Sequence, residues 1–564
     1  MKQIHRKTFI LLLCALLVLG GCQSQSSSEQ TTVESSGSSQ IQAETSQSSS
    51  TAATSTMDVS SQFSDRDLDG TYDESSAIKV QLNGSSASCD SDAVTISGSQ
   101  IIVKEEGVYL FSGSLTDGQI VVTAGDTDKV QIVLSGAEIT SSTSAPIYVL
   151  EADKVFITLA ANTENTLTNG GEYVAIDENN IDGVIFSKAD LTLNGTGTLT
   201  INAPVGHGAV SKDDLVITGG TYIITAESQG LSGKDCIAIA DGSFTIVSGK
   251  DGIHAENEDD TTLGSLYIAG GSFDIDAQGD AVSASGALQI DGGSFDLFTG
   301  EGSASVTMTS STFGPGQRGS SATQTDSSTA SEDTTSQKGI KGEGTFTING
   351  GVFTIDSVDD CFHAGGELYI TSGEFNLSSG DDAIHSDDAV TIEDGTFTIP
   401  YCYEGIEGLS LTINGGSFDI VSHDDGLNGA GGADGSGFGR GQQDQFSSSS
   451  SSFILINDGT FTIVSQGDCI DSNGDLTING GVLDLTCNGA GNTALDTDGT
   501  YTNNGGSVST NDGSESNPGG MGMGGGQRGG GAQSGSLQGG GQRGGGMAMT
   551  PPQEGAGSGS DTPQ

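Results

Sequence analysis

Short acidic segments that end or begin at a histidine occur four times in the chain. KDGIH, DDCFH and DDAIH end at His254, His363 and His385, and HDDGLN begins at His423. Carboxylate and imidazole groups can bind a cation, exchange a proton with a substrate or hydrogen-bond to a polar ligand. Which of these functions is possible depends on whether the segments lie side by side in the fold. That depends on the period at which they recur in the sequence.

That period predicts a stacked fold. A turn followed by a large apolar residue repeats about every 22 residues over the second half of the chain. In LTINGGSFDIVSHDDGLNGAGG (411–432), short alternating runs give three strands and three bends per period. This pattern predicts an all-β fold, a single-stranded parallel β-helix with roughly 22 residues per coil. The predicted buried stack contains Phe273, Phe295, Phe353, Phe375, Phe397, Phe418 and Phe461.

Two other repeat folds do not fit. A propeller blade needs about 40 residues, and the calcium-binding nonapeptide roll has too short a repeat. Cys236, Cys361 and Cys469 are assigned to one small-residue slot of the coil, which predicts packing rather than disulfides.

Stacking turns residues one period apart into neighbours about 4.8 Å apart. Asp360 and Asp382 then lie on adjacent coils, followed by Glu404 and Asp425. Carboxylates about 5 Å apart repel each other by about 3 kcal/mol at an effective dielectric near 20. Calcium would relieve this repulsion, since it accepts irregular sets of oxygen ligands; alternatively, the aspartates only favour bends and point to solvent. The predicted calcium ligands are Asp280, Asp359, Asp360, Asp381, Asp382, Asp424, Asp425 and Asp468.

Histidines and lysines form two further ladders. His363 and His385 fall one period apart, and no Cys/His spacing indicates zinc. The two rings are expected to stack as a surface ladder, with polar contact to a sugar and catalysis as the alternatives. Lys188, Lys212 and Lys234 could line one edge, paired with Asp190, Asp213 and Asp235. The predicted ligand-binding residues are His363, His385, Lys212 and Lys234.

The chain divides into four regions. Residues 1–21 have a basic start and an apolar run that ends in LGGC, which resembles a bacterial lipobox. This predicts a lipoprotein signal peptide and lipidation of Cys22, hence anchoring at the extracellular face of a bacterial cell membrane. The other regions are a Ser/Thr-rich tether (22–62), the β-helix domain (63–510, with inserts at about 303–337 and 430–452) and a disordered Gly-rich tail (511–564).

Charge restricts the partners. The formal net charge is −56, from 18 Lys and Arg against 74 Asp and Glu. Nucleic acid and anionic membrane surfaces are poor partners for such a field, whereas divalent cations are good ones. We expect a monomer.

The stretch from 107 to 170 resembles a family of bacterial carbohydrate-binding β-helix proteins. LTDGQIVV, DKVQIVL, DKVFITLA and TENTL follow one another in the order found in that family, which is typified by a clostridial surface protein that binds cellulose and polygalacturonate. The resemblance extends over about residues 75–510. It implies a right-handed, pectate-lyase-like β-helix, bound calcium and affinity for acidic plant polysaccharide without established lyase activity.

The residues favour binding over catalysis. A pectate-lyase reaction needs a strong base, typically arginine, and between 170 and 510 the only arginines, Arg318 and Arg440, lie in the inserts. A lysine base remains open. GHG at 206–208 resembles polygalacturonase, but an Arg-x-Lys substrate clamp is missing.

The sequence therefore predicts a lipid-anchored protein that binds acidic plant or cell-wall polysaccharide without cleaving it. Polygalacturonate and pectin-like chains are the expected ligands, with cellulose as a further one, and calcium is expected to bridge protein and uronate carboxylates. The alternatives are a structural surface stalk or adhesin without a glycan site, and a calcium-dependent polysaccharide lyase.

Overall fold

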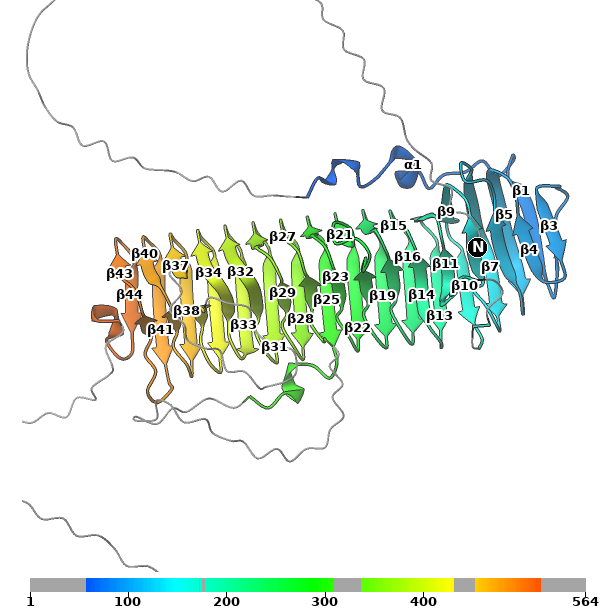
Figure 1. The fold of residues 1–564 in the computed structure, drawn as a ribbon. Helices are drawn as coiled ribbons and strands as arrows, with labels where there is room; N and C mark the ends of the chain where they lie inside the picture. Colours follow the sequence, from blue (N-terminus) through cyan, green and yellow to red (C-terminus); the bar gives the residue numbers. More distant parts are fainter. Residues whose placement is uncertain (1–56, 172, 175–177, 309–335, 431–451, 519–564) are drawn as a thin grey trace, which may run out of the picture. The chain divides into compact units, whose positions relative to one another are not determined.

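The computed structural model describes residues 57–171, 173–174, 178–308, 336–430 and 452–518 (Figure 1). All of them belong to one compact unit, which starts at Ser55. The predicted signal peptide, Cys22, most of the tether, most of both inserts and the tail from 519 lie outside the described residues. Among the residues described, no helix is long and apolar enough to cross a membrane.

The strands stack in parallel, and each one pairs with the strand three places later in the chain over most of the fold (Figure 1). Each coil therefore contributes one short strand to each of three parallel sheets, which is the predicted parallel β-helix. β32 and β34 each bend to serve two of the sheets.

The first sheet carries the polar segments of interest. Its strands are β14 (His207–Ser211), β17 (Leu231–Gly233), β20 (Ile253–Ala255), β23 (Val282–Ala284), β26 (Ile340–Gly342), β29 (Phe362–Ala364), β32 (Ile384–Ile392), β34 (Ile406–Ile413), β36 (Leu427–Gly429), β39 (Ile470–Ser472) and β42 (Leu495–Thr497).

The second and third sheets complete the coils. The second contains β12 (Asp190–Gly195), β15 (Asp214–Ile217), β18 (Cys236–Ile239), β21 (Ser265–Ile268), β24 (Leu288–Ile290), β27 (Phe346–Ile348), β30 (Leu368–Ile370), β37 (Phe453–Ile456), β40 (Asp475–Ile478) and β43 (Tyr501–Asn503). The third contains β13 (Thr198–Ala203), β16 (Thr221–Ala226), β19 (Ser243–Ser248), β22 (Ser272–Ala277), β25 (Ser294–Thr299), β28 (Val352–Ser357), β31 (Glu374–Ser379), β33 (Thr396–Cys402), β35 (Ser417–Ser422), β38 (Thr460–Ser465), β41 (Val482–Cys487) and β44 (Ser507–Thr510).

The first coils have longer strands and two antiparallel pairs, β1 with β2 and β3 with β4. They comprise β1 (Ile78–Gly84), β2 (Ala87–Ser88), β3 (Val94–Ser97), β4 (Gln100–Val103), β5 (Gly107–Leu115), β6 (Gln119–Thr123), β7 (Lys129–Ser141), β8 (Ile147–Glu151), β9 (Lys154–Leu159), β10 (Glu164–Asn169) and β11 (Gly183–Ser187). The short helices are η1 (Val59–Ser61), α1 (Asp65–Leu68), η2 (Ser303–Ser305) and η3 (Ser514–Ser516).

The residues before β1 are tied to the second sheet. Ser64 and Asp67 form a capping box at the start of α1. Asp67 is buried, pairs with the Lys154 ammonium at 2.8 Å and accepts a hydrogen bond from Thr192 Oγ1. This segment therefore packs as part of the fold.

The predicted phenylalanine stack is confirmed. Strands of the third sheet alternate exposed and buried residues, as in β19, and from β16 to β38 their first buried residue is the aromatic one. Consecutive rings from Phe244 to Phe461 have centroids 4.5–5.1 Å apart and are 2–5° from parallel. Such offset stacks contribute beyond their apolar area.

Steric contact explains why a glycine stands two residues before each stacked aromatic residue. Gly351 has a φ of 128°, and a Cβ added there would lie 2.9 Å from the Phe353 ring. The GG-x-F signature therefore combines a backbone conformation that favours glycine with room for the stacked ring.

The cysteine prediction was right in part. The Cys361 and Cys469 carbonyls accept hydrogen bonds from the N–H groups of Ile340 and Leu427, each the first residue of a first-sheet strand one coil earlier. The two cysteines therefore share a coil slot, and both side chains are buried. Cys236 instead opens β18 opposite Asp214, so its assignment to that slot was wrong. The six cysteines in the described part of the chain are free thiols.

Candidate functional site

Two rows of polar residues run along the first sheet. The strand row has one residue per coil, matched by strand register: His254, Ser283, Lys341, His363, His385, Glu407, Asn428, Asp471 and Asp496. The bend row lies three residues earlier in each coil: Asp251, Asp280, Lys338, Asp360, Asp382, Glu404, Asp425 and Asp468. The predicted column of acids is thus present, although metal binding by it stays a prediction.

The carboxylates of the bend row cap the backbone of the next coil. An Oδ1 atom accepts the N–H of the residue in the same slot one coil further on. The acceptor–donor pairs are Asp251–Asp280 (2.9 Å), Asp280–Lys338 (2.8 Å), Asp360–Asp382 (3.1 Å), Asp382–Glu404 (3.2 Å) and Asp425–Asp468 (2.6 Å). A buried N–H without a partner is costly, so the acids are needed by the bends. The alternative that they only point to solvent is wrong for Asp280, Asp360 and Asp382, which are buried.

A lysine occupies one slot of the bend row. Lys338 is 5% exposed, and its Nζ lies 2.7 Å from Asp359 Oδ1 and 2.9 Å from Asp360 Oδ2. Burial alone would raise the pKa of Asp360, but the Lys338 ammonium and His363 hold it well below its usual value. Calcium at Asp359 and Asp360 would have to displace this ammonium. The signal was present in the sequence, since Lys338 stands one period before Asp360.

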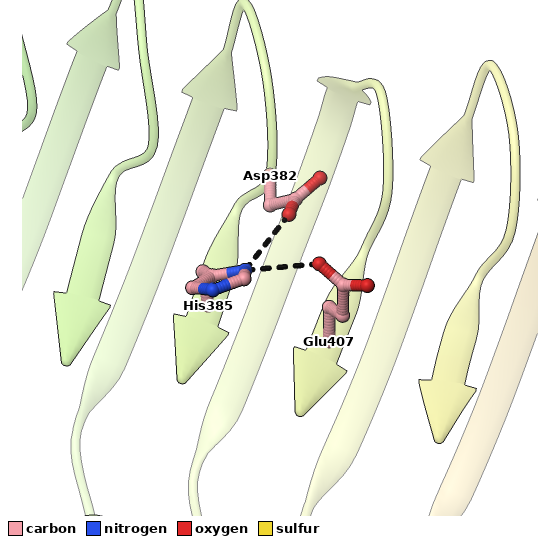
Figure 2. Close-up of side chains that lie close together, drawn as sticks. All are labelled: Asp382, His385 and Glu407. Carbon is pink, nitrogen blue, oxygen red and sulfur yellow. Dashed lines mark hydrogen bonds and ion pairs between the residues drawn. The ribbon is translucent and has the colours of Figure 1, made fainter. Parts of the chain in front are cut away.

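One coil further on, Asp382, His385 and Glu407 meet in a buried cluster (Figure 2). His385 Nδ1 lies 3.2 Å from Asp382 Oδ2 and 2.9 Å from Glu407 Oε2, and Nε2 lies 3.3 Å from Asp387 Oδ1. Burial would lower the pKa of His385, but the three carboxylates raise it well above its usual value. Burial, followed by the neighbouring Asp382, raises the pKa of Glu407.

The predicted histidine ladder is confirmed as a stack but not as a surface feature. The rings of His363 and His385 lie 4.9 Å apart and 6° from parallel. His385 is 1% exposed, so it does not reach a polysaccharide outside the coils. His363 is partly exposed and contacts Asp360 Oδ2 through Nδ1 at 2.9 Å.

The last coils hold acids without basic neighbours. Carboxylate oxygens of Asp468, Asp471 and Asp496 lie within 4.8 Å of one another. Burial, with further increases from neighbouring carboxylates, raises the pKa of Asp468 to about 8 and that of Asp471 to about 7. In the described part of the chain, no ion pair links these groups to Lys, Arg or His. Of the predicted calcium ligands, Asp468 therefore lies in a group of carboxylates that has no basic partner among the described residues.

A cleft with basic residues lies at the other end of the strand row. Its lining comes from β14, β17, β20 and the residues beside them: His207, Ser211, Lys212, Gln229, Ser232, Lys234, His254, Glu256, Glu258 and Asp259. The structure thus places the predicted ligand-binding residues Lys212 and Lys234 together. It adds His207 and His254, which sequence reasoning did not assign to a ligand.

The predicted partners of these lysines were wrong. Lys234 Nζ pairs with Asp259 Oδ2 at 2.7 Å, whereas Asp235 accepts a hydrogen bond from Asn257. Lys212 Nζ lies 5.4 Å from the centre of the Phe186 ring. Its ammonium therefore has a cation–π contact that still allows approach by an anion.

Comparison with known proteins identifies the class. The chain belongs to the family of carbohydrate-binding domain-containing proteins, whose model matches residues 97–383 and 381–523. A carbohydrate-binding domain-containing protein of Acetivibrio thermocellus is 36% identical over 151 residues, which is 26% of this chain and 53% of that protein. The chain thus spans about half the length of this curated relative. A solved polysaccharide lyase-like protein from C. thermocellum, a gadolinium derivative, is 26% identical over 52% of this chain and 97% of its own, with a TM-score of 0.38.

Proposed function

We propose that this protein binds acidic polysaccharide of the polygalacturonate or pectin type without cleaving it. The observation that carries this proposal is the cleft that contains Lys212, Lys234, His207 and His254. The chain has only 18 Lys and Arg in total and a net charge of −56, so most of its surface repels a polyanion. A uronate chain would be attracted to the lysines and histidines gathered in this cleft, which Glu256, Glu258 and Asp259 also line.

The cleft supports binding rather than lyase chemistry. Lys234 is paired with Asp259, and His254 contacts Asp251 and Glu256 at 2.6 and 2.9 Å. Arg66, the single arginine among the described residues, lies in α1 and donates to Gln131. Among the described residues the cleft therefore has no arginine, the typical base of this reaction, and Lys212 is the one lysine of its lining without an ion pair.

We further propose that calcium binds the acids of the last coils, around Asp468, Asp471 and Asp496. Their oxygens are close together, and no basic group compensates them among the residues described. Calcium accepts six to eight oxygens and fits such a set. Through the LGGC sequence, the protein would be lipid-anchored at Cys22 on the extracellular face of a bacterial membrane.

Retention of the full chain on polygalacturonate tests this function. We expect retention by the wild type, a loss of at least tenfold in affinity for Lys212→Gln/Lys234→Gln, and no ultraviolet absorbance from unsaturated product. Lys79→Gln/Lys129→Gln is the matched control, because these exposed lysines make the same change in net charge elsewhere.

The same assay separates the other readings. Equal retention of the cleft variant and the wild type would contradict the cleft as the site. Retention that persists in chelator would leave cleft binding in place and contradict a calcium bridge. No retention on polygalacturonate, pectin or cellulose with calcium present would favour a surface stalk, and rising absorbance would make the protein a lyase.

A further inference from the structure

With its carboxylates ionised, as cation ligands would be, the cluster of Asp382, His385 and Glu407 has too few protons for its contacts. His385 Nδ1 faces two carboxylate oxygens, at 3.2 and 2.9 Å (Figure 2). Its Nε2 faces Asp387 Oδ1 at 3.3 Å. If Nε2 carries the proton of a neutral ring, Nδ1 and both oxygens present only lone pairs to one another. If Nδ1 carries it, one N–H must serve two carboxylates and Nε2 faces a third without a proton.

Protonation of His385 still leaves an excess of negative charge. Glu404 lies beside the cluster, because Asn428 Nδ2 donates to Glu404 Oε2 and Glu407 Oε1 at 2.8 and 3.2 Å. Asn428 is neutral and supplies no charge. With the three carboxylates ionised, one imidazolium would thus face Asp382, Glu404 and Glu407 in a place where all four side chains are buried. Buried charges without compensation are strongly unfavourable.

The neighbouring coil provides an internal comparison. Asp360 and His363 repeat the Asp-x-x-His arrangement of Asp382 and His385, and the two imidazole rings stack. There the Lys338 ammonium lies between Asp359 and Asp360 and supplies the positive charge. At the His385 coil, no lysine or arginine makes an ion pair with the cluster in the described part of the chain.

We propose that Asp382, His385 and Glu407 bind one divalent transition-metal cation of the zinc, cobalt or manganese type. Imidazole nitrogen with carboxylate oxygen suits these ions, whereas calcium takes oxygen ligands. Donor atoms about 2.1 Å from a tetrahedral ion are about 3.4 Å from each other, close to the separations observed. Asp387 then has the role of the carboxylate that fixes the tautomer of a metal-bound histidine.

The site is structural rather than catalytic. Its three ligands are 3%, 1% and 5% exposed, so a substrate has no access to the ion. Closed sites of this kind contribute folding energy. Asp382 and His385 belong to one coil and Glu407, on β34, to the next, so the ion links two adjacent coils. Glu404, which shares the Asn428 amide with Glu407, is a candidate for a fourth ligand.

Cobalt titration of the full, tag-free chain tests the proposal, with excess calcium present to fill the acidic end. We expect one Co²⁺ per chain, visible d–d absorption of a nitrogen and oxygen site without thiolate charge-transfer bands, and displacement by Zn²⁺. Glu407→Gln and His385→Gln should each weaken Co²⁺ binding at least tenfold. His363→Gln is the matched control, since it removes the stacked partner and should leave the affinity unchanged.

Thermal unfolding provides a second readout that does not depend on the colour of the site. Zn²⁺ should raise the midpoint of the wild type and of His363→Gln, and not that of Glu407→Gln. Absence of saturable Co²⁺ binding by the wild type would overturn the proposal in favour of a buried imidazolium. Equal binding by Glu407→Gln and the wild type would overturn it as well.

Discussion

His363 and His385 stack 4.9 Å apart and 6° from parallel, yet their coils obtain positive charge in different ways. The carboxylates beside His363 pair with a buried lysine, Lys338, of the preceding coil, and those beside His385 have no lysine in contact among the described residues. The repeat therefore preserves the position of a side chain while its electrostatic surroundings change from one coil to the next.

Lys338→Met should strongly destabilise the fold. The methionine keeps most of the buried volume but leaves Asp359 and Asp360 without their ammonium. Loss of one partner of a buried ion pair costs about 3–5 kcal/mol, measurable by urea unfolding. Lys341→Met, which removes a partly exposed lysine of the same sheet, should cost far less. Similar losses for both variants would contradict this interpretation of Lys338.

Gly351→Ala should destabilise the fold by more than about 1 kcal/mol, because the new Cβ would meet the Phe353 ring at a backbone φ of 128°. Gly350→Ala is the matched control. Its Cβ would have no neighbour closer than 3.5 Å, and its φ lies outside the region that favours glycine. Thermal midpoints of both variants check the prediction, and equal midpoints would show that the ring contact is unimportant.

Asp214→Asn should stabilise the protein at neutral pH. Burial, followed by the charges of Asp190 and Asp213, raises the pKa of Asp214 to about 6, against 3.8 for an unperturbed aspartate, while Lys154 opposes the shift. The ionised carboxylate therefore lowers stability fully above pH 6, and the penalty disappears as pH falls towards 3.8. The midpoint difference between variant and wild type should accordingly shrink between pH 7 and pH 4. A difference that is constant with pH would contradict the shifted pKa.

Calcium should raise the thermal midpoint of the wild type, and Asp471→Asn should reduce that increase. Asp471 lies between Asp468 and Asp496, where carboxylates lack basic partners in the described residues. Asp484→Asn removes an exposed aspartate of β41 and should leave the effect of calcium unchanged. If chelator has no effect on the wild type, the acids at this end hold protons instead of calcium.

The architecture could be predicted from the sequence because every coil repeats the same turn and aromatic residue. The Phe273–Phe295 contact and the His363–His385 stack both follow from a separation of one period. Burial of His385 could not be predicted, because the period fixes which residues are neighbours but not how their side chains cover one another. The period predicts that Asp360 and Asp382 belong to a column of acids. It does not predict that each carboxylate accepts a backbone N–H from the next coil.

Interruptions of the repeat explain the remaining errors. Lys338 follows a long insert, so its place in the bend row was hidden even though it precedes Asp360 by one period. Lys234 pairs with Asp259, which lies in the extra residues before Phe273, and a search for partners next in sequence therefore chose Asp235. The basic cleft draws His207 from one coil and His254 from another two coils on, which no local motif indicates.

The rings of Phe295 and Phe353 are 4.7 Å apart, as are those of Phe273 and Phe295, although the first pair is separated by far more sequence. Phe418 and Phe461 behave in the same way, at 4.6 Å. Extra residues at a bend therefore cost the stack little more than loop closure, which grows slowly with length. This scaffold offers ready positions for grafting: a foreign peptide inserted at such a bend would be displayed without disturbing the coils on either side.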